Sequence, residues 1–222
     1  MPVSFMLNGK TVVCGPDETI LEVAERHGVE IPRLCYMKGM RPDGNCRTCM
    51  VEINGERVLA PSCCRYPKEG MEVTTDSKRA LISQKMSIEL LLSDTPETSY
   101  TLNSELVAWA RKVSIGEPRF AARPQPLEDL SHPAMAVHLD ACIQCTRCVR
   151  ACRDEQGNDV IGLAFRGAEA RISFDALAPL GDSTCVACGE CVQACPTGAL
   201  MPAKGAGLLE VTKQVDSVCP YC

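Results

Sequence analysis

The chain has 222 residues, of which 16 are cysteines, and a formal net charge of −5 at pH 7. This length allows one or two domains with cores of their own, and the negative charge gives no support for nucleic-acid binding. The first ten residues contain neither a basic segment nor a long apolar run, so the sequence predicts no signal peptide and no transmembrane helix, and a cytoplasmic location without a membrane partner is expected. In a reducing compartment, this many thiols indicate bound metal rather than disulfides.

Residues 1–76 are predicted to form a small α+β domain. Two short strands flank Asn8-Gly9, a strong hairpin turn signal, at 3–7 and 10–13. A helix is expected next, capped by Asp17, with Ile20, Val23, Ala24 and His27 on one face and Gly28 as its stop. Returning strands are expected at 50–53, 57–59 and 71–75. Hairpin, helix and returning strands are the order of a β-grasp domain.

The loop of this domain carries a first cysteine set, spaced C-x10-C-x2-C-x13-C: Cys35, Cys46, Cys49 and Cys63. Three ligands on one loop and a distant fourth predict a [2Fe-2S] site, although plant-type ferredoxins have a shorter first gap. Gly44 is expected to let the loop fold back so that backbone N–H groups face sulfur. Structural zinc is the alternative. Cys64 adjoins Cys63, so the residues alone leave the fourth ligand open, and the remaining Cys14 is expected to be a buried apolar residue.

Residues 77–133 are predicted to be a helical and proline-rich connector. A helix is expected over 76–93, with Asp76 as its cap and one apolar stripe formed by Leu81, Ile88, Leu91 and Leu92. A second amphipathic helix is marked by Leu102, Leu106, Trp109 and Val113. Prolines between residues 116 and 133 indicate a linker. No histidine lies at ligand spacing from a cysteine triplet, so surface or packing roles are expected for His27, His132 and His138.

Residues 134–202 contain two cysteine runs, 142–152 and 185–195, that both read C-x2-C-x2-C-x3-C. In two-cluster ferredoxins the fourth cysteine of each run ligates the other cluster. This pattern predicts one [4Fe-4S] cluster on Cys142, Cys145, Cys148 and Cys195. It predicts a second on Cys152, Cys185, Cys188 and Cys191. A tetrahedral structural zinc site usually takes two C-x2-C pairs, so it does not explain a third cysteine at this short spacing.

Short strands are expected between the two runs, at 160–165 and 170–174. Residues 203–222 are expected to be a connector that ends in a C-x2-C pair, Cys219 and Cys222. The sequence contains no nucleophile–base pair, no Walker loop and no dinucleotide fingerprint, so no catalytic residue is predicted. The fold class expected is α+β, and the function expected is electron transfer.

Four segments resemble the N-terminal part of the α subunit of cytosolic NAD-dependent formate dehydrogenase: 46–53, 131–152, 183–202 and 215–222. The chain is more loosely similar to the large iron–sulfur subunit of respiratory NADH dehydrogenase and to hydrogenase diaphorase subunits. The resemblance implies a relay between a molybdenum or tungsten bis-pterin domain, which oxidises formate, and a β subunit that carries FMN and the NAD site. It also favours Cys63 as the fourth [2Fe-2S] ligand, because the family ligand directly follows a serine such as Ser62.

The resemblance further implies that Cys219 and Cys222 begin a third [4Fe-4S] motif. Its other ligands and the molybdopterin-type domain would lie beyond residue 222, so the chain is expected to be truncated. Relatives often carry another [4Fe-4S] cluster after the β-grasp domain, and we expect it to be absent because no cysteine lies between Cys64 and Cys142. The rival interpretations are a free-standing iron–sulfur carrier or hydrogenase diaphorase small subunit, and a zinc-stabilised interaction module.

Overall fold

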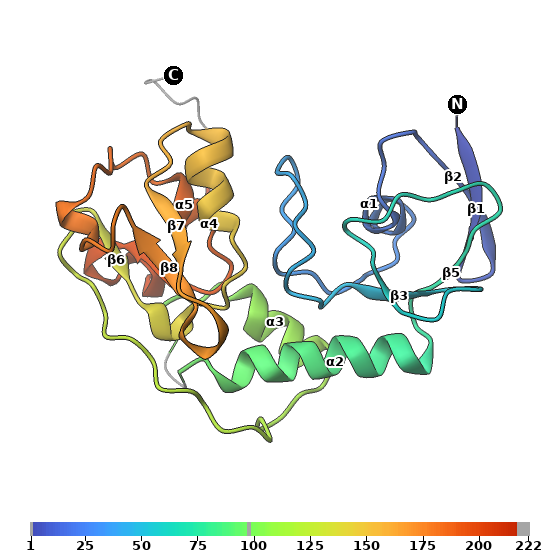
Figure 1. Ribbon diagram of the computed structural model, residues 1–222, viewed down its shortest axis with the longest axis horizontal. Coiled ribbons are helices and arrows are strands. Elements are labelled where there is room, and N and C mark those ends of the chain that lie inside the picture. The colour runs from blue at the N-terminus through green and yellow to red at the C-terminus, as the bar shows by residue number, and fades with distance from the viewer. Residues whose placement is uncertain (1, 97–98, 217–222) are drawn as a thin grey trace.

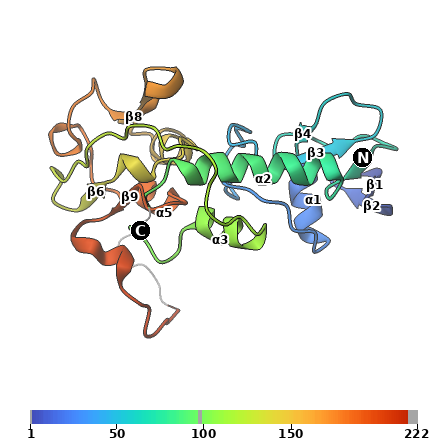
Figure 2. The ribbon, with the colours of Figure 1, turned by 90° about the horizontal axis from the view of Figure 1, so that it is seen from below.

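The computed structural model describes residues 2–96 and 99–216 (Figure 1). An N-terminal sheet with one covering helix lies at one end, and a C-terminal part built from short helices and two-stranded sheets lies at the other. Figure 2 shows a long helix, α2, running between the two ends along the length of the molecule. Within the described part of the chain, no helix is both long enough and apolar enough to span a membrane.

The N-terminal sheet has five strands in the order β2-β1-β5-β3-β4. Their bounds are β1 Val3–Leu7, β2 Lys10–Cys14, β3 Met50–Ile53, β4 Ala60–Pro61 and β5 Glu72–Thr74. The expected hairpin is confirmed, because β1 pairs antiparallel with β2 and both Asn8 and Gly9 have positive φ. The strand expected at 57–59 is wrong. That segment bends at the surface with Val58 60% exposed, and β3 pairs with β4 and β5 instead.

Helix α1 (Ile20–Arg26) packs its apolar side into the sheet core through Ile20, Leu21, Val23 and Ala24. Its cap is Thr19 rather than Asp17. The Thr19 hydroxyl accepts from the Glu22 N–H at 3.3 Å, and the Glu22 carboxylate accepts from the Thr19 N–H at 2.8 Å. This reciprocal pair needs the residue directly before the helix, and Asp17 lies too early in the chain. The helix ends as expected before Gly28, but His27 is exposed rather than part of the buried face.

Helices α2 (Lys78–Ser93) and α3 (Glu105–Lys112) form the connector and pack together around Ile88 and Leu106. Ser77, not Asp76, caps α2 by accepting from the Ala80 N–H at 3.2 Å. The expected apolar positions Leu81 and Leu102 are wrong, because these side chains face solvent at 50% and 56% exposure. The buried face of α2 includes Gln84 instead. Its side-chain amide donates to the Met50 and Thr75 carbonyls and so ties the helix to the sheet.

The proline-rich linker lies along α2 and is held there by two ion pairs. Arg119 donates to both oxygens of Glu89 at 2.7 Å, and Arg123 Nε lies 2.6 Å from Asp94 Oδ2. The Arg119 hydrogen bonds lower the pKa of Glu89 from 4.5 to about 2. The linker therefore has a fixed path rather than a free one.

Substituting Glu89→Gln is expected to lower the melting temperature at neutral pH. A carboxyl whose pKa is lower in the folded chain stabilises it above the unfolded value of 4.5, and this contribution disappears as pH falls toward about 2. The difference in melting temperature between the two chains should therefore stay constant from pH 8 to about 5 and shrink below that. Calorimetry across this range measures it. A difference that grew on acidification would contradict the assignment.

The C-terminal part contains two small antiparallel sheets of two strands each, of which the second is a hairpin. Strand β6 (Met135–Val137) pairs with β9 (Leu200–Pro202), and β7 (Ile161–Ala164) pairs with β8 (Arg171–Phe174). The hairpin of β7 and β8 confirms the strands expected between the cysteine runs, within slightly narrower bounds. Two short helices, α4 (Arg147–Arg150) and α5 (Glu190–Ala194), follow corresponding points of the two runs. Short 3-10 segments join these elements: Leu139–Ala141, Gly167–Glu169, Leu180–Asp182 and Ala203–Leu208.

Candidate metal centres

The two cysteine runs have the same backbone conformation. In the first run Gln144 and Thr146 have positive φ, and in the second run Ala187 and Gly189 do, at the equivalent positions. Each left-handed residue turns the chain sharply, so successive thiols and N–H groups point to one side. A short helix then carries the third cysteine of each run. A single π-helical turn, Ala151–Glu155, follows α4 and contains Cys152. The spacing alone did not predict these turns.

The eight thiols border two separate cavities. The first four-thiol cavity is lined by Cys142, Cys145, Cys148 and Cys195. The second four-thiol cavity is lined by Cys152, Cys185, Cys188 and Cys191. The structure thus groups three cysteines of each run with the fourth cysteine of the other. In the described residues no three His, Cys, Asp or Glu side chains converge on a point as ligands of one ion do, and the thiols instead surround a space.

Backbone amides donate to sulfur in both cavities. Val160 N lies 3.3 Å from Cys152 Sγ, Ala187 N 3.4 Å from Cys185 Sγ, and Leu200 N 3.5 Å from Cys195 Sγ. Such donors offset the negative charge of thiolate ligands and tune a cluster's potential. A donor set made only of thiols, with amides facing the sulfurs, fits an iron–sulfur cluster. The residues present therefore suit the group that their spacing predicts.

Burial raises the pKa of several of these thiols. It raises the pKa of Cys142 to about 11 and that of Cys191 to about 12, and it raises the pKa of Cys148 well above its usual value. Metal ligation requires thiolates, so loading these cavities must release protons. Each cavity has two buried thiols, and Cys188 of the second cavity is the exposed one among the eight.

The predicted [2Fe-2S] cysteines also come together. Cys35, Cys49 and Cys63 are buried, and Cys46 is partly buried. Cys49 Sγ lies 3.4 Å from Cys63 Sγ, and Cys46 Sγ accepts from the Cys35 N–H at 3.4 Å. Hydrogen bonds from the Cys46 and Cys63 thiols lower the pKa of Cys35. A thiolate is therefore favoured in this group, as ligation to iron needs.

Cys63 and Cys64 occupy different surroundings. Cys63 is fully enclosed and contacts both Cys35 and Cys49. Cys64 is half-buried, with its sulfur 3.5 Å from Cys63 Sγ and in contact with Gly44. Cys14 lies in β2 within the apolar core, as expected for a spare thiol. Cys219 and Cys222 lie outside the described residues.

Gly44 is required by both its backbone and its neighbours. Its φ is +64°, and a Cβ there would lie 2.8 Å from Cys64 Sγ. Gly44→Ala should therefore destabilise the chain by about 1–3 kcal/mol and disturb the [2Fe-2S] loop. Gly39→Ala is the matched control. Gly39 also has a positive φ, +92°, but an added Cβ would point into open space, so only backbone strain of about 1 kcal/mol is expected. Urea titration and [2Fe-2S] EPR of both variants measure the effects. Equal losses would show that the Cys64 contact is unimportant.

The histidines take packing or surface positions. His138 stacks on Tyr100 with ring centroids 3.7 Å apart, and its Nδ1 lies 3.5 Å from the Glu128 carboxylate. His132 is buried and accepts from the Ala134 N–H at 3.2 Å. His138 therefore faces an aromatic ring and a carboxylate, although it lies close to Cys142 in the sequence.

Two protein families match this chain. Residues 1–78 match the 2Fe-2S iron-sulfur cluster binding domain, and residues 141–199 match the 4Fe-4S dicluster domain. The chain therefore carries one [2Fe-2S] and two [4Fe-4S] clusters, in the order that the sequence predicts, and the α+β class agrees with its mixed sheet and helices.

Longer oxidoreductase subunits are similar to nearly the whole chain. An NADH-quinone oxidoreductase subunit of Rhizobium meliloti (strain 1021) is 33% identical over 92% of this chain and 25% of its own length. The HndD subunit of the NADP-reducing hydrogenase of Solidesulfovibrio fructosivorans is 33% identical over 90% of this chain and 36% of its own. A putative formate dehydrogenase of Staphylococcus haemolyticus (strain JCSC1435) is 28% identical over 88% of this chain and 20% of its own length. The chain thus spans only a fifth to about a third of these relatives.

A solved structure is similar over most of its length. A chain of an NAD+-reducing [NiFe]-hydrogenase in the H2-reduced state superposes with a TM-score of 0.84 at 28% identity. The match covers 91% of this chain and 88% of that one. The comparisons therefore support an iron–sulfur region of oxidoreductase subunits, and formate dehydrogenase is one of several kinds of relative.

Proposed function

We propose that this chain is the electron-transfer portion of an NAD-dependent formate dehydrogenase α subunit. It would relay electrons between a molybdenum- or tungsten-pterin formate site outside these residues and a flavin- and NAD-binding β subunit. The observation that best supports a relay is the pair of four-thiol cavities, each of which combines three cysteines of one run with the fourth cysteine of the other. The same chain also holds a third cysteine site. The formate assignment is supported by the resemblance of segments 131–152 and 183–202 and by the relatives named as formate dehydrogenases.

A second candidate is the small diaphorase subunit of a hydrogenase. The observation that favours it is the solved hydrogenase chain, which this chain covers almost completely rather than in part. Both candidates use the same three clusters and the same kind of flavin partner. They differ in the electron donor, which is formate in one case and hydrogen in the other.

The proposed organisation has four parts. Residues 1–76 form a β-grasp [2Fe-2S] domain, supported by the five-stranded mixed sheet and its single covering helix. Residues 77–133 form the connector, and residues 134–202 form the dicluster domain. Residues 203–222 are assigned, from the resemblance alone, to a connector and the start of a molybdopterin-type domain. The thiol-rich composition favours a reducing compartment such as the cytoplasm.

The proposed ligands follow the three thiol groups. The [2Fe-2S] cluster is held by Cys35, Cys46, Cys49 and Cys63. One [4Fe-4S] cluster is held in the first four-thiol cavity and one in the second. When bound, these clusters supply reversible one-electron chemistry. Cys188 of the second cavity is exposed at the surface, so we assign the second cavity to the contact with the electron donor.

Metal analysis after anaerobic purification tests the relay. Ligand counting predicts about ten iron per chain with acid-labile sulfide to match. About fourteen iron would show that a cluster has been missed and would overturn the ligand assignment. Two or three zinc ions without sulfide would overturn the electron-transfer function in favour of a zinc-stabilised module.

The electron donor is tested on the native complex, recovered through a tag on this chain. Formate, hydrogen or NADH is added to separate oxidised samples, and bleaching of the iron–sulfur absorbance is followed. Bleaching by formate and by NADH is the expected result. Bleaching by hydrogen but not by formate would replace the formate assignment with the hydrogenase alternative.

A further inference from the structure

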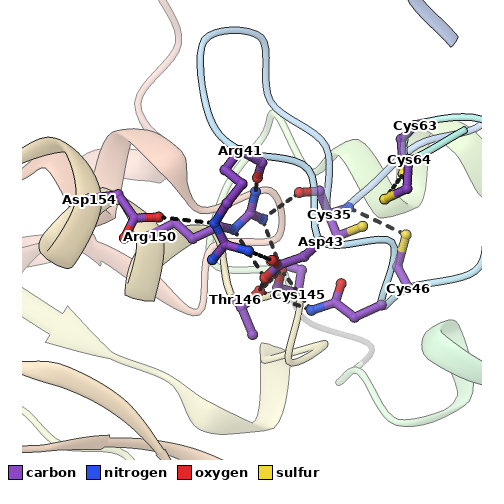
Figure 3. Close-up of polar contacts among 11 residues, drawn as sticks. Cys35, Arg41, Asp43, Cys46, Cys63, Cys64, Cys145, Thr146, Arg150 and Asp154 are labelled. Atoms are coloured by element: carbon purple, nitrogen blue, oxygen red, sulfur yellow. Dashed lines mark hydrogen bonds and ion pairs between the residues drawn. The ribbon is translucent and has the colours of Figure 1, made fainter. Parts of the chain in front are cut away.

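One buried charge joins the [2Fe-2S] loop to the dicluster domain (Figure 3). The Arg150 side chain, on α4, is 2% exposed. Its Nη2 donates to the Cys35 carbonyl at 2.5 Å and to the Cys145 carbonyl at 3.3 Å. Its Nη1 donates to the Arg41 carbonyl at 2.5 Å. One guanidinium thus binds the backbone of two proposed ligands that belong to different clusters.

Asp43 and Asn45 complete this junction from the [2Fe-2S] side. Asp43 Oδ2 lies 3.4 Å from Arg150 Nε, an ion-pair distance without hydrogen-bond geometry, and 2.6 Å from the Thr146 hydroxyl. The Asn45 amide donates to Thr146 Oγ1 at 2.9 Å and to the Cys145 carbonyl at 3.3 Å. The loop between Cys35 and Cys46 is therefore fastened to the turn that carries Cys145.

A second arginine repeats the contact one helical turn earlier. Arg147 is also buried, and its Nη1 lies 3.3 Å from the Leu34 carbonyl and 2.8 Å from Glu105. Residues three apart share one face of a helix, so α4 directs both guanidinium groups toward the [2Fe-2S] loop. The charge of Arg147 has a carboxylate in hydrogen-bond contact. Arg150 instead gives its hydrogen bonds to carbonyl groups.

A buried arginine is costly unless its donors are satisfied, and apolar packing would join two domains at lower cost. The planar fork of arginine, however, holds several acceptors in one fixed geometry, which a lysine ammonium does not. Its positive charge also lies beside two groups of thiolate ligands, where it favours added negative charge. Both properties bear on electron transfer rather than on stability alone.

We propose that Arg150 is the positioning residue of the relay. It fixes the [2Fe-2S] site against the first four-thiol cavity, so electrons cross between the domains at this junction and not from the second cavity. The inference rests on the proposed cluster ligands. The step moves one electron, which oxidises one cluster and reduces the other by one electron each, and transfers no proton and breaks no bond. Arg150 takes no electron itself.

Two substitutions separate position from charge. Arg150→Met removes both the fork and the charge, whereas Arg150→Lys keeps the charge and loses the fork. Arg153→Gln is the matched control. Arg153 lies three residues after Arg150, but its side chain is 54% exposed and, among the described residues, forms an ion pair with Asp159 alone. Each holoprotein is reduced stepwise under EPR, and the midpoint potentials and the magnetic coupling between reduced clusters are recorded.

Arg150→Met is expected to lose the coupling that broadens the [2Fe-2S] signal and to shift both midpoint potentials downward. Arg150→Lys should keep the potentials near those of the parent chain while its coupling weakens. Arg153→Gln should change neither the coupling nor the [2Fe-2S] potential. Unchanged coupling and potentials in an Arg150→Met chain that holds all its iron would overturn the proposal. If that variant fails to assemble, unchanged coupling in Arg150→Lys overturns it instead.

These outcomes are separate from failure of the proposed function. Iron and sulfide in the parent chain decide whether the clusters and their ligands are as assigned. The Arg150 variants are compared only with that parent chain. A parent chain with three clusters and no magnetic coupling between the [2Fe-2S] site and either [4Fe-4S] site would overturn the junction and leave the electron-transfer function standing.

Discussion

Replacing Cys195 by serine removes the [4Fe-4S] cluster of the first run and leaves the cluster of its own run in place. This result is expected because Cys195 lines the cavity of Cys142, Cys145 and Cys148. Double substitutions make the pairing visible in the iron content. Cys142→Ser with Cys195→Ser should cost one cluster and leave about six iron per chain, by ligand counting. Cys185→Ser with Cys195→Ser should remove both [4Fe-4S] clusters and leave about two iron per chain.

The converse pair uses the fourth cysteine of the first run. Cys152 lines the second cavity, so Cys152→Ser with Cys185→Ser should remove one cluster, and Cys152→Ser with Cys142→Ser should remove two. Cys14→Ser is the control for loss of a thiol as such, because Cys14 lies in the N-terminal core. If the variants that combine Cys185 with Cys195, or Cys142 with Cys152, kept about six iron and the other two double variants kept about two, each run would hold its own cluster. The crossed assignment would then be wrong.

Cys63→Ser is expected to abolish the [2Fe-2S] EPR signal, whereas Cys64→Ser is expected to keep it. Cys63 is enclosed and its sulfur lies 3.4 Å from Cys49 Sγ, so its loss removes a ligand from the centre of the group. Cys64 is half-buried and packs against Gly44. Loss of the Cys63 thiolate should lower the iron content by about two per chain, while both [4Fe-4S] signals remain.

The two adjacent positions act as each other's control, because each variant replaces one thiol by a hydroxyl in the same segment. EPR of the reduced chain and iron analysis measure both outcomes. Signal loss in Cys64→Ser with retention in Cys63→Ser would reverse the ligand choice. Retention in both would mean that either sulfur serves as the fourth ligand.

The cysteine spacing predicted the cluster types and their order because ligation imposes short, fixed intervals on the chain. The hairpin turn at Asn8-Gly9 and the end of the first helix before Gly28 were also predicted correctly, because both need a glycine with positive φ. The helix caps were less predictable. Thr19 and Ser77 each stand close to an aspartate that satisfies the same preference, and only the position of the first helical turn decides between them.

Contacts between distant segments could not be predicted from the pattern. Gln84 is buried because two backbone carbonyls of the sheet accept from it, and polar composition gave no sign of that. Leu81 and Leu102 follow apolar periodicity yet face solvent, since packing against neighbours overrides the local pattern. Arg150 was missed for the same reason. Its partners Cys35 and Arg41 lie more than a hundred residues away in the chain.

Coulometric titration of the anaerobically purified chain, with EPR samples taken at each step, tests the relay most directly. One [2Fe-2S] and two [4Fe-4S] clusters predict uptake of about three electrons per chain, one for each centre. The samples should show one [2Fe-2S] signal and two interacting [4Fe-4S] signals, all reversed on reoxidation. Uptake of no electrons by a chain that holds only zinc would contradict an electron-transfer function.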